Sequence, residues 1–166
     1  MEEKKIFSIL DLKSGFHHVN INEESIKYTA FVTPNGQYEY QRMPFGLKND
    51  LSVFQRFINN IFRDLIYKRL IVIYMDDLLI ATDDFKEHRE LLRSVLTRIT
   101  NRALQLNLEK CKFGSESIDY LGYAVSSAGI RLHDAHIAAY KCQSCPFLFR
   151  TIFVLQKICA AVFSYR

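Results

Sequence analysis

The sequence predicts an α+β domain in which two long helices pack against a mainly antiparallel sheet. Short β-branched and aromatic runs, bounded by turn residues, alternate with two longer segments whose apolar residues recur with a helical period. The resulting order is β–ββ–α–ββ–α–ββ. Such an order is typical of an α+β fold with hairpins covered by helices.

Seven runs rich in β-branched and aromatic residues are predicted to be strands. They are Ile6–Leu10, Tyr28–Thr33, Gln37–Met43, Leu70–Met75, Leu78–Thr82, Ser117–Tyr120 and Leu121–Ser126. The first strand ends at Asp11 and is followed by a turn that contains Gly15. Pro34-Asn35-Gly36 predicts a hairpin between the second and third strands, and Ala128-Gly129 predicts a further turn.

Two segments have the period of amphipathic helices. In Asp50–Ile66 the apolar residues fall on one face and polar residues on the opposite face, with Asn49 or Asp50 as the N-cap. The second helix extends over about Phe85–Leu104, and an acidic capping box begins at Asp84. Leu106–Lys112, after this helix, is a short basic connector.

Asp76 and Asp77 interrupt the apolar run Leu70–Ala81. Burying two unpaired charges in a strand is costly, so a tight turn at this pair is expected, with a strand on either side. The carboxylates would then face water or a cation at the tip of a hairpin. Divalent metal binding is one explanation for this placement. An ordinary solvated turn is the other, and the dipeptide alone does not decide between them.

At 166 residues, with 49% hydrophobic and 13% aromatic content, the chain suits one folded domain or one subdomain. The formal net charge of +4 is small, but positive charge gathers in the middle. Six basic residues and two acids lie in 42–69, and seven basic residues and three acids lie in 86–112. This pattern suits a phosphate-backbone partner, although solvated helix faces have a similar composition.

The cysteines give no disulfide framework, and no signal peptide opens the chain, so reduced thiols in an intracellular setting are expected. Cys142 and Cys145 have the spacing of half a zinc site, but without a second pair a fortuitous spacing is the preferred interpretation. Ile152–Phe163 is too short and too interrupted for a membrane span, so no membrane partner is expected.

Two predicted strands end in carboxylates, at Asp11 and at Asp76. If these strands are neighbours in one sheet, the two side chains could share one or two divalent ions. Mg²⁺ suits such a site because it takes few protein carboxylates and leaves positions for substrate phosphates. The sequence alone does not establish that the strands are adjacent.

Six blocks that occur in order along the chain resemble one known family. They are FSILDLKSGFHHV (Phe7–Val19), TAFVTPNGQYEYQRMPFGLKN (Thr29–Asn49), FQRFIN (Phe54–Asn59), YMDDLLI (Tyr74–Ile80), LNLEKCKFG (Leu106–Gly114) and YLGYAVSSAGI (Tyr120–Ile130). Together they resemble the reverse transcriptase of gypsy-type LTR retrotransposons over roughly residues 4–139. A lone YMDD would be a weak motif, whereas six ordered blocks are specific.

The resemblance implies a polymerase palm that uses two Mg²⁺ ions, or Mn²⁺, to add dNTPs to a primer. The implied catalytic and metal-binding residues are Asp11, Asp76, Asp77 and the Leu12 carbonyl, with Lys110 as general acid. The implied nucleotide-binding residues are Leu12, Phe16, Pro44, Phe45 and Gly46. The implied template–primer residues are Gln55, Tyr74, Met75, Leu121, Gly122 and Tyr123. Phe16 would exclude a ribose 2′-hydroxyl, with an ordinary core aromatic as the alternative; for Lys110 the alternative is a basic surface residue.

The resemblance also implies partners: an RNA or DNA template–primer, dNTPs, and the fingers, thumb, RNase H and integrase parts of a polyprotein in cytoplasmic virus-like particles. The chain departs from the family pattern at Asp50-Leu51-Ser52, where Ala-Pro-Ala is usual. Residues 1–139 are interpreted as a partial palm and 140–166 as a degenerate or displaced tail. The alternative function is an inactive relic that at most binds nucleic acid; an unrelated metal-binding module leaves the ordered blocks unexplained.

Overall fold

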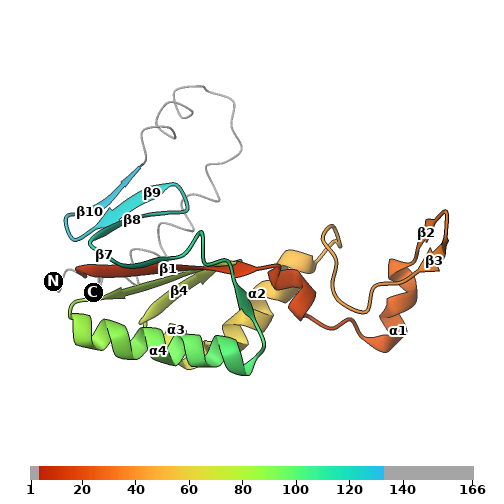
Figure 1. The fold of residues 1–166 in the computed structure, drawn as a ribbon, viewed down its shortest axis with the longest axis horizontal. Coiled ribbons are helices and arrows are strands. Elements are labelled where there is room, and N and C mark those ends of the chain that lie inside the picture. Colours follow the sequence, from red (N-terminus) through yellow and green to blue (C-terminus); the bar gives the residue numbers. More distant parts are fainter. Residues whose placement is uncertain (1–3, 133–166) are drawn as a thin grey trace.

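Figure 1 shows the fold of the chain in a computed structural model, which describes residues 4–132. The strands are β1 (Ile6–Lys13), β2 (Phe31–Thr33), β3 (Gly36–Tyr38), β4 (Ile71–Tyr74), β5 (Asp77–Thr82), β6 (Gln105–Leu106), β7 (Lys112–Ser115), β8 (Ser117–Tyr120), β9 (Tyr123–Ser126) and β10 (Gly129–Leu132). The helices are α1 (Glu23–Ile26), α2 (Asp50–Ile61), α3 (Arg63–Tyr67) and α4 (Phe85–Asn101), with 3₁₀ turns at Gly15–His18 and Lys27–Thr29. This mixture of helices and antiparallel strands confirms the predicted α+β class.

Strand β1 is the centre of the main sheet. On one side it pairs with β5, which in turn pairs with β4, and on the other side it pairs with β6 and β7. All of these pairings are antiparallel, as predicted. Phe7 and Ile9 face one core while Leu10 and Leu12 face another, so β1 is apolar on both faces.

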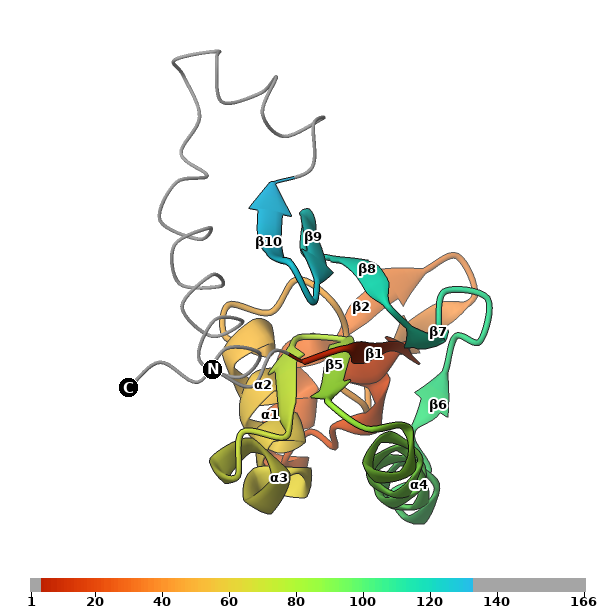
Figure 2. The same ribbon diagram turned by 90° about the vertical axis from the view of Figure 1, so that its left-hand side faces the viewer.

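The described residues form three layers, with this sheet in the middle (Figure 2). Helices α2, α3 and α4 cover one face, and their apolar stripes pack on it through Phe54, Ile58 and Val95, which are fully buried. The small sheet β8–β9–β10 covers the opposite face with Tyr120 and Tyr123. The two layers bury β1, β4 and β5 from both sides, whereas the edge strands β6 and β7 remain largely exposed.

The first long helix is shorter than the sequence predicts. Helix α2 ends at Ile61, Phe62 leaves the helical conformation with φ −109° and ψ 17°, and α3 then adds one further turn. The apolar period hides this break, because Phe62 and Leu65 are buried on the same side as the rest of the stripe. The side chain of Asn49 makes no capping bond among the described contacts.

The second long helix follows the prediction more closely. The Asp84 carboxylate accepts hydrogen bonds from the backbone N–H groups of Lys86 and Glu87, which confirms it as the N-cap. Helix α4 ends at Asn101, and the buried Leu104 lies just beyond it. Leu104 therefore belongs to the core without belonging to the helix.

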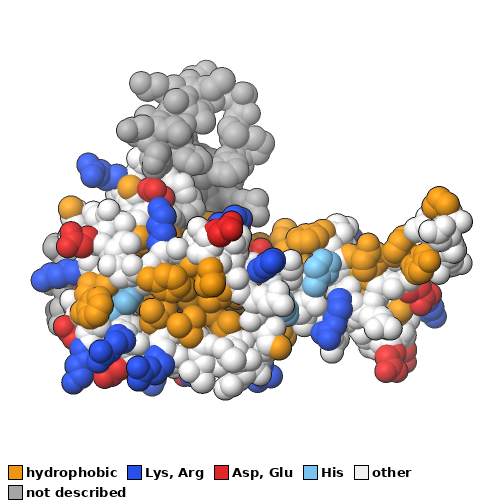
Figure 3. Space-filling view, viewed as in Figure 1, with side chains coloured by type: hydrophobic (Ala, Val, Ile, Leu, Met, Phe, Trp, Pro, Cys, Tyr) orange, Lys and Arg blue, Asp and Glu red, His pale blue; other side chains and the backbone are white. Residues whose placement is uncertain are grey.

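An arm made of α1, β2 and β3 projects from the layered body (Figure 1). Its strands are shorter than predicted: Tyr28 lies in a 3₁₀ turn, and the hairpin ends at Tyr38. Hydrophobic side chains remain open to solvent on it (Figure 3), including Val32, which is 80% exposed. No second layer covers this hairpin among residues 4–132, which leaves its strands without packing that would extend them.

The predicted connector after α4 also contributes strands. Its ends form β6 and β7, which both pair with β1. The predicted boundary at residue 139, the tail 140–166 and the Cys142–Cys145 pair lie outside the described residues. Within 4–132, no helix has the length and apolar character needed to cross a membrane.

Candidate active site

The β4–β5 hairpin carries Asp76 and Asp77, as predicted, but its turn lies one residue earlier. Tyr74 pairs with Asp77, so the two-residue loop consists of Met75 and Asp76. Met75 has a positive φ of 53°, whereas Asp76 does not, which is the pattern of a type II′ turn. A side chain in this conformation is strained, and the hairpin needs outside support to keep it.

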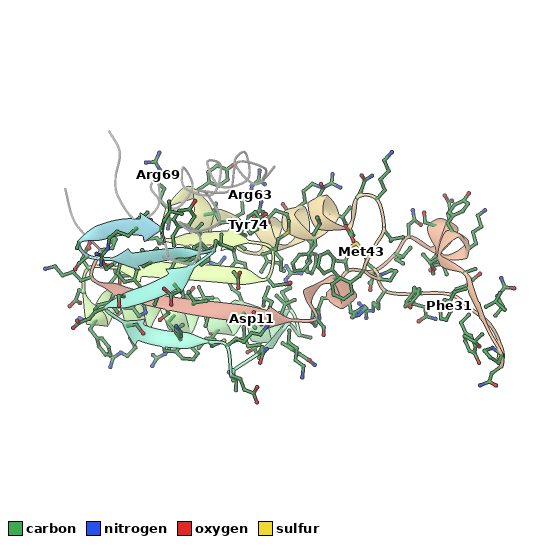
Figure 4. The ribbon with its side chains drawn as sticks, turned by 90° about the horizontal axis from the view of Figure 1, so that it is seen from above. Asp11, Phe31, Met43, Arg63, Arg69 and Tyr74 are labelled. Carbon is green, nitrogen blue, oxygen red and sulfur yellow. The ribbon has the colours of Figure 1, made fainter. Side chains whose placement is uncertain are left out.

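The structure brings Asp11 to the same place. Strand β1 continues to Lys13 because Leu12 pairs with Leu106 of β6, so Asp11 lies within the strand and not after it. Asp11 pairs directly with Asp77 in the β1–β5 register. Because side chains alternate along a strand, and Leu10 and Leu78 face the helices, both carboxylates project toward the layer of β8 and β9. Figure 4 labels Asp11 on β1.

Asp76 is joined to β1 through the backbone. The Leu12 N–H donates to the Asp76 carbonyl at 2.8 Å. The side-chain Oδ1 of Asp76 is buried and has no hydrogen-bond partner among the described residues. Burial, and then the neighbouring charges of Asp11 and Asp77, raise the pKa of Asp76 to about 6. Burial and Asp11 likewise raise the pKa of Asp77.

Lys110 lies beside these carboxylates. The Asn107 N–H donates to the Asp11 carbonyl at 2.9 Å, and the Lys110 N–H donates to the Asn107 carbonyl at 3.0 Å. This turn places Lys110 Nζ 3.7 Å from Asp11 Oδ2, while 68% of the lysine side chain remains exposed. Lys110 is therefore an accessible cation at the edge of the acidic site, which opposes the rise in pKa of both Asp76 and Asp77.

Cys111 is a neighbour that sequence reasoning did not suggest. Its Sγ lies 3.5 Å from the Asp11 backbone N, as acceptor, and 3.3 Å from the Asn107 carbonyl, as donor. The thiol therefore supports the backbone that carries Asp11. Nothing in the local sequence around Cys111 indicates this role.

The acidic site offers carboxylate oxygens, which are the type of ligand that a hard divalent cation prefers. Asp11 and Asp77 present facing carboxylates, and Asp76 adds a carboxylate oxygen without a partner. Within residues 4–132, however, no three His, Cys, Asp or Glu side chains are already gathered closely enough to hold a metal ion. A cation here would draw on two or three carboxylates and take its remaining ligands from elsewhere, as Mg²⁺ does with substrate phosphates. Ligation by the Leu12 carbonyl stays a prediction.

An aromatic wall adjoins the acidic site. Phe16 is buried and stacks on Phe54, with ring centroids 4.8 Å apart and planes at 26°, and it meets Phe45 at 4.8 Å and 52°. Phe45 is 65% exposed, so it forms the open end of the wall. The Gly46 N–H donates to the Asp50 carboxylate at 2.9 Å, so the residue that departs from the family pattern fastens the 44–46 turn to the start of α2.

Gln55 fastens the strained hairpin to α2. Its Oε1 accepts from the Met75 N–H at 2.9 Å, and its Nε2 donates to the Ile73 carbonyl at 3.3 Å and to Asn59 Oδ1 at 2.9 Å. The amide thus forms hydrogen bonds with backbone groups at the edge of β4 that a neighbouring strand would otherwise pair with. This internal role differs from the template contact that the sequence suggested, which stays a prediction.

The β8–β9 hairpin lies over the other side of the site. Leu121 and Gly122 have positive φ values of 51° and 84°, which is the pattern of a type I′ loop. Tyr123 is buried, and Tyr74 packs against the same core. The Tyr120 hydroxyl donates to the Asp77 carbonyl at 3.4 Å and ties this hairpin to β5.

The architecture and the acidic site are accompanied by a family match. A sequence model described as reverse transcriptase (RNA-dependent DNA polymerase) matches residues 1–125. The chain belongs to the reverse transcriptase family. Its ordered motifs therefore have the origin that the resemblance implied.

Relatives of this reverse transcriptase chain include polyproteins of Drosophila melanogaster transposons. It is 42% identical over 135 residues to the retrovirus-related Pol polyprotein from transposon opus, which covers 81% of this chain and 13% of that protein. For transposon 297 the values are 41%, 80% and 12%, and for transposon gypsy they are 36%, 76% and 12%. The resemblance to gypsy-type elements is confirmed, and the chain spans about an eighth of these relatives.

Solved structures support the same fold. A foamy viral protease–reverse transcriptase in complex with double-stranded DNA matches with a TM-score of 0.76 and 23% identity, over 87% of this chain and 25% of that one. A foamy viral protease–reverse transcriptase in complex with an RNA/DNA hybrid matches with a TM-score of 0.73 and 23% identity, over 96% and 21%. The fold is thus that of a reverse transcriptase palm.

Proposed function

We propose that this chain is the palm portion of an RNA-directed DNA polymerase that transfers deoxynucleotides to a primer 3′-hydroxyl. The observation that carries the proposal is the direct pairing of Asp11 with Asp77, beside Asp76 in the adjoining turn. Family membership supports it independently. The chain is a small part of its relatives, so the activity is proposed for the palm as it works within a longer protein.

In this proposal Asp11, Asp76 and Asp77 hold two divalent ions, with the Leu12 carbonyl as a further ligand. When bound, such ions activate the attacking hydroxyl and neutralise charge on the departing pyrophosphate. The residues themselves supply a rigid platform. The pairing of β1 with β5 and the bond from the Leu12 N–H to the Asp76 carbonyl fix the backbone positions that carry the three carboxylates before substrate arrives.

Lys110 is proposed as the proton donor to the leaving pyrophosphate. Its ammonium group is largely exposed, and therefore accessible to a phosphate, while Asp11 holds it at the edge of the site. A lysine in this position also offsets part of the mutual repulsion of the carboxylates. Both effects favour nucleotidyl transfer, because they offset negative charge on the departing pyrophosphate and on the carboxylates.

The nucleotide is proposed to lie against Phe16 and the 44–46 turn. Phe45 is open to solvent and Phe16 is held from behind by Phe54, so the wall has an accessible front and a fixed back. The proposed template–primer contacts are Gln55, Tyr74, Met75, Leu121, Gly122 and Tyr123. Two contacts support this proposal: Gln55 bonds to Met75 in the β4–β5 turn, and Tyr120, next to Leu121, bonds to the Asp77 carbonyl.

Residues 1–139 are proposed as a partial palm that works with the fingers, thumb, RNase H and integrase segments of a retrotransposon polyprotein. The relatives' designation as Pol polyproteins supports this context. The proposed substrates of this polyprotein are dNTPs and an RNA or DNA template–primer, and its proposed setting is an intracellular particle. The open hydrophobic arm of α1, β2 and β3 is consistent with a missing covering layer.

Primer extension tests this function. The purified chain is incubated with a DNA primer on an RNA template, dNTPs and Mg²⁺, and incorporation is expected. Asp76→Asn should abolish it, whereas Glu90→Gln, which neutralises an exposed carboxylate on α4, should retain it. Binding of template–primer without extension would instead support an inactive relic. If the chain neither binds template–primer nor extends it, both functions are rejected for this chain.

A further inference from the structure

Gly15 lies where the acidic site and the aromatic wall meet. It is buried and begins the 3₁₀ turn directly after β1. A Cβ atom added to Gly15 would collide with Asp76 Oδ1 and with Cζ of Phe54, and it would lie 2.9 Å from Cε2 of Phe54. No side chain fits at this position unless one of these two groups moves.

The backbone does not explain the glycine. Gly36, Gly46, Gly114, Gly122 and Gly129 all have positive φ values, which side chains rarely adopt. Gly15 is not among the residues with a positive φ. Alanine could therefore adopt its backbone conformation, and the requirement for glycine at residue 15 is one of space alone.

The two neighbours of Gly15 differ in how firmly they are held. Phe54 of α2 is fully buried in the core between the helices and the sheet, and its ring stacks on Phe16. Asp76 Oδ1 has no hydrogen-bond partner among the described residues, so only the shape of its surroundings fixes it. An added atom would push the carboxylate more readily than it would push a ring packed in the core.

We propose that Gly15 is a positioning residue: its missing side chain forms the slot that sets the Asp76 carboxylate against the Phe54–Phe16 stack. The slot couples the proposed metal-binding side of the site to its proposed nucleotide-binding side, because Asp76 forms one wall of the slot and Phe54, which stacks on Phe16, forms the other. This inference rests on the proposed polymerase function for its consequence in catalysis. The steric coupling between Gly15 and Asp76 can be tested without it.

The first test is a double-mutant cycle in urea unfolding, which needs neither activity nor metal. Gly15→Ala should lower the unfolding midpoint of the wild-type chain, and it should lower the midpoint less in an Asp76→Ala background, where one of the two obstructing groups is absent. Gly129→Ala is the control for additivity, because its cost comes from the positive φ of 125° and nothing, Asp76 included, lies within 4 Å of its added Cβ. Its effect should be the same in both backgrounds.

If Gly15→Ala alone does not fold, the cycle still decides the matter. Recovery of folding in the Gly15→Ala/Asp76→Ala variant supports the slot. Equal effects of Gly15→Ala in both backgrounds, or no recovery of folding, overturn the assignment to Asp76. Recovery of folding by Phe54→Leu without any recovery by Asp76→Ala would show that the ring alone requires the glycine, which also overturns the assignment to Asp76.

The second test concerns metal and catalysis. Titration with Mn²⁺ alone, followed by electron paramagnetic resonance, should show binding at least fivefold weaker in Gly15→Ala than in the wild type. In primer extension the same variant should lose at least tenfold in kcat with little change in the KM for dNTP. A wild-type chain without extension would reject polymerase activity of this chain on its own, whereas unchanged Mn²⁺ binding in a folded Gly15→Ala variant would reject the positioning role.

Discussion

The carboxylates of Asp11 and Asp77 occupy directly paired positions on adjacent antiparallel strands. Like charges in such positions repel, and the acidic pair sits at the end of an otherwise apolar register of Leu10 with Leu78 and Ile9 with Leu79. The repulsion is visible in the raised pKa of Asp77, for which Asp11 is the leading electrostatic cause after burial. This pairing therefore costs stability in the metal-free chain, a cost that the proposed cation would relieve.

Asp77→Asn should stabilise the metal-free chain while removing its activity. The amide keeps the shape of the side chain but removes one of the facing charges, a gain of roughly 0.5–1 kcal/mol for a cross-strand pair. Urea unfolding in the presence of a chelator measures the stability, and primer extension measures the activity. A less stable Asp77→Asn variant would contradict the repulsion, and Glu90→Gln serves as the control for loss of a surface charge.

The stability of the metal-free chain should fall as pH rises from about 4 to about 6. The pKa of Asp76 is raised from 3.8 to about 6 in the folded chain, so in this window the folded state binds more protons than the unfolded state. Stability linked to Asp76 is therefore present at low pH and is lost as the carboxyl ionises. Since the carboxyl is partly exposed, screening limits the effect to about 1 kcal/mol.

Thermal unfolding of wild type and Asp76→Asn across pH 4–7 isolates this effect, because other titrating groups are shared. The difference between the two melting temperatures should grow with pH and should shrink when Mg²⁺ is added. A difference that does not depend on pH would mean that the Asp76 carboxyl titrates normally.

Local structure could be predicted from the sequence where a pattern has one physical solution. The Asp76-Asp77 interruption predicts a hairpin because buried charges are not tolerated in a strand, and Asp84 predicts a helix start because its side chain can cap N–H groups. The same reasoning misses the break at Phe62, where the apolar period continues although the helix does not.

The adjacency of β1 and β5 could not be derived in the same way. No local pattern links Asp11 to Asp77, because pairing between distant strands depends on the packing of the whole domain; only the family resemblance indicated it. Gln55 illustrates the same limit at the level of one side chain. A polar residue on a helix face gives no sign that it will bond to the backbone of a hairpin.

Gln55→Leu should weaken catalysis by loosening the Met75–Asp76 turn. The change leaves the Met75 N–H and the Ile73 carbonyl without their partner, at a cost of about 1–2 kcal/mol, or on the order of tenfold in kcat/KM. Hydrogen exchange at the Met75 amide should accelerate. Asn59→Ala is the matched control, because it removes a contact of Gln55 and leaves both hairpin bonds in place.

Phe16→Val separates the two interpretations of Phe16. If the ring excludes a ribose 2′-hydroxyl, the variant should incorporate ribonucleotides at least tenfold more readily relative to dNTPs, and Phe16→Tyr should not. If Phe16 is only a core aromatic, Phe16→Val should cost about 1–3 kcal/mol of stability and leave sugar selectivity unchanged. Parallel single-nucleotide incorporation and urea unfolding give both readouts.

A buried polar network joins β1, β5, β7 and α4 at the other end of the sheet. The Thr82 hydroxyl donates to the Asp84 carbonyl at 3.4 Å, so it accepts from Nδ1–H of His88 at 2.8 Å. His88 Nε2 then accepts from the Ser8 hydroxyl at 2.7 Å, and Ser8 accepts from the Gly114 N–H at 2.9 Å. Burial lowers the pKa of His88, which favours this neutral form.

Ser8→Ala should destabilise the chain by about 1–3 kcal/mol, because it leaves the buried His88 Nε2 without its donor and also removes the acceptor of the Gly114 N–H. Ser52→Ala, at an exposed position of α2, removes the same hydroxyl and should change stability by less than about 0.5 kcal/mol. Urea unfolding measures both. Equal costs for the two variants would mean that the network adds nothing, and a cost confined to Ser8→Ala would show that β1 is anchored to α4 through His88, three residues before the Asp11 carboxylate on the same strand.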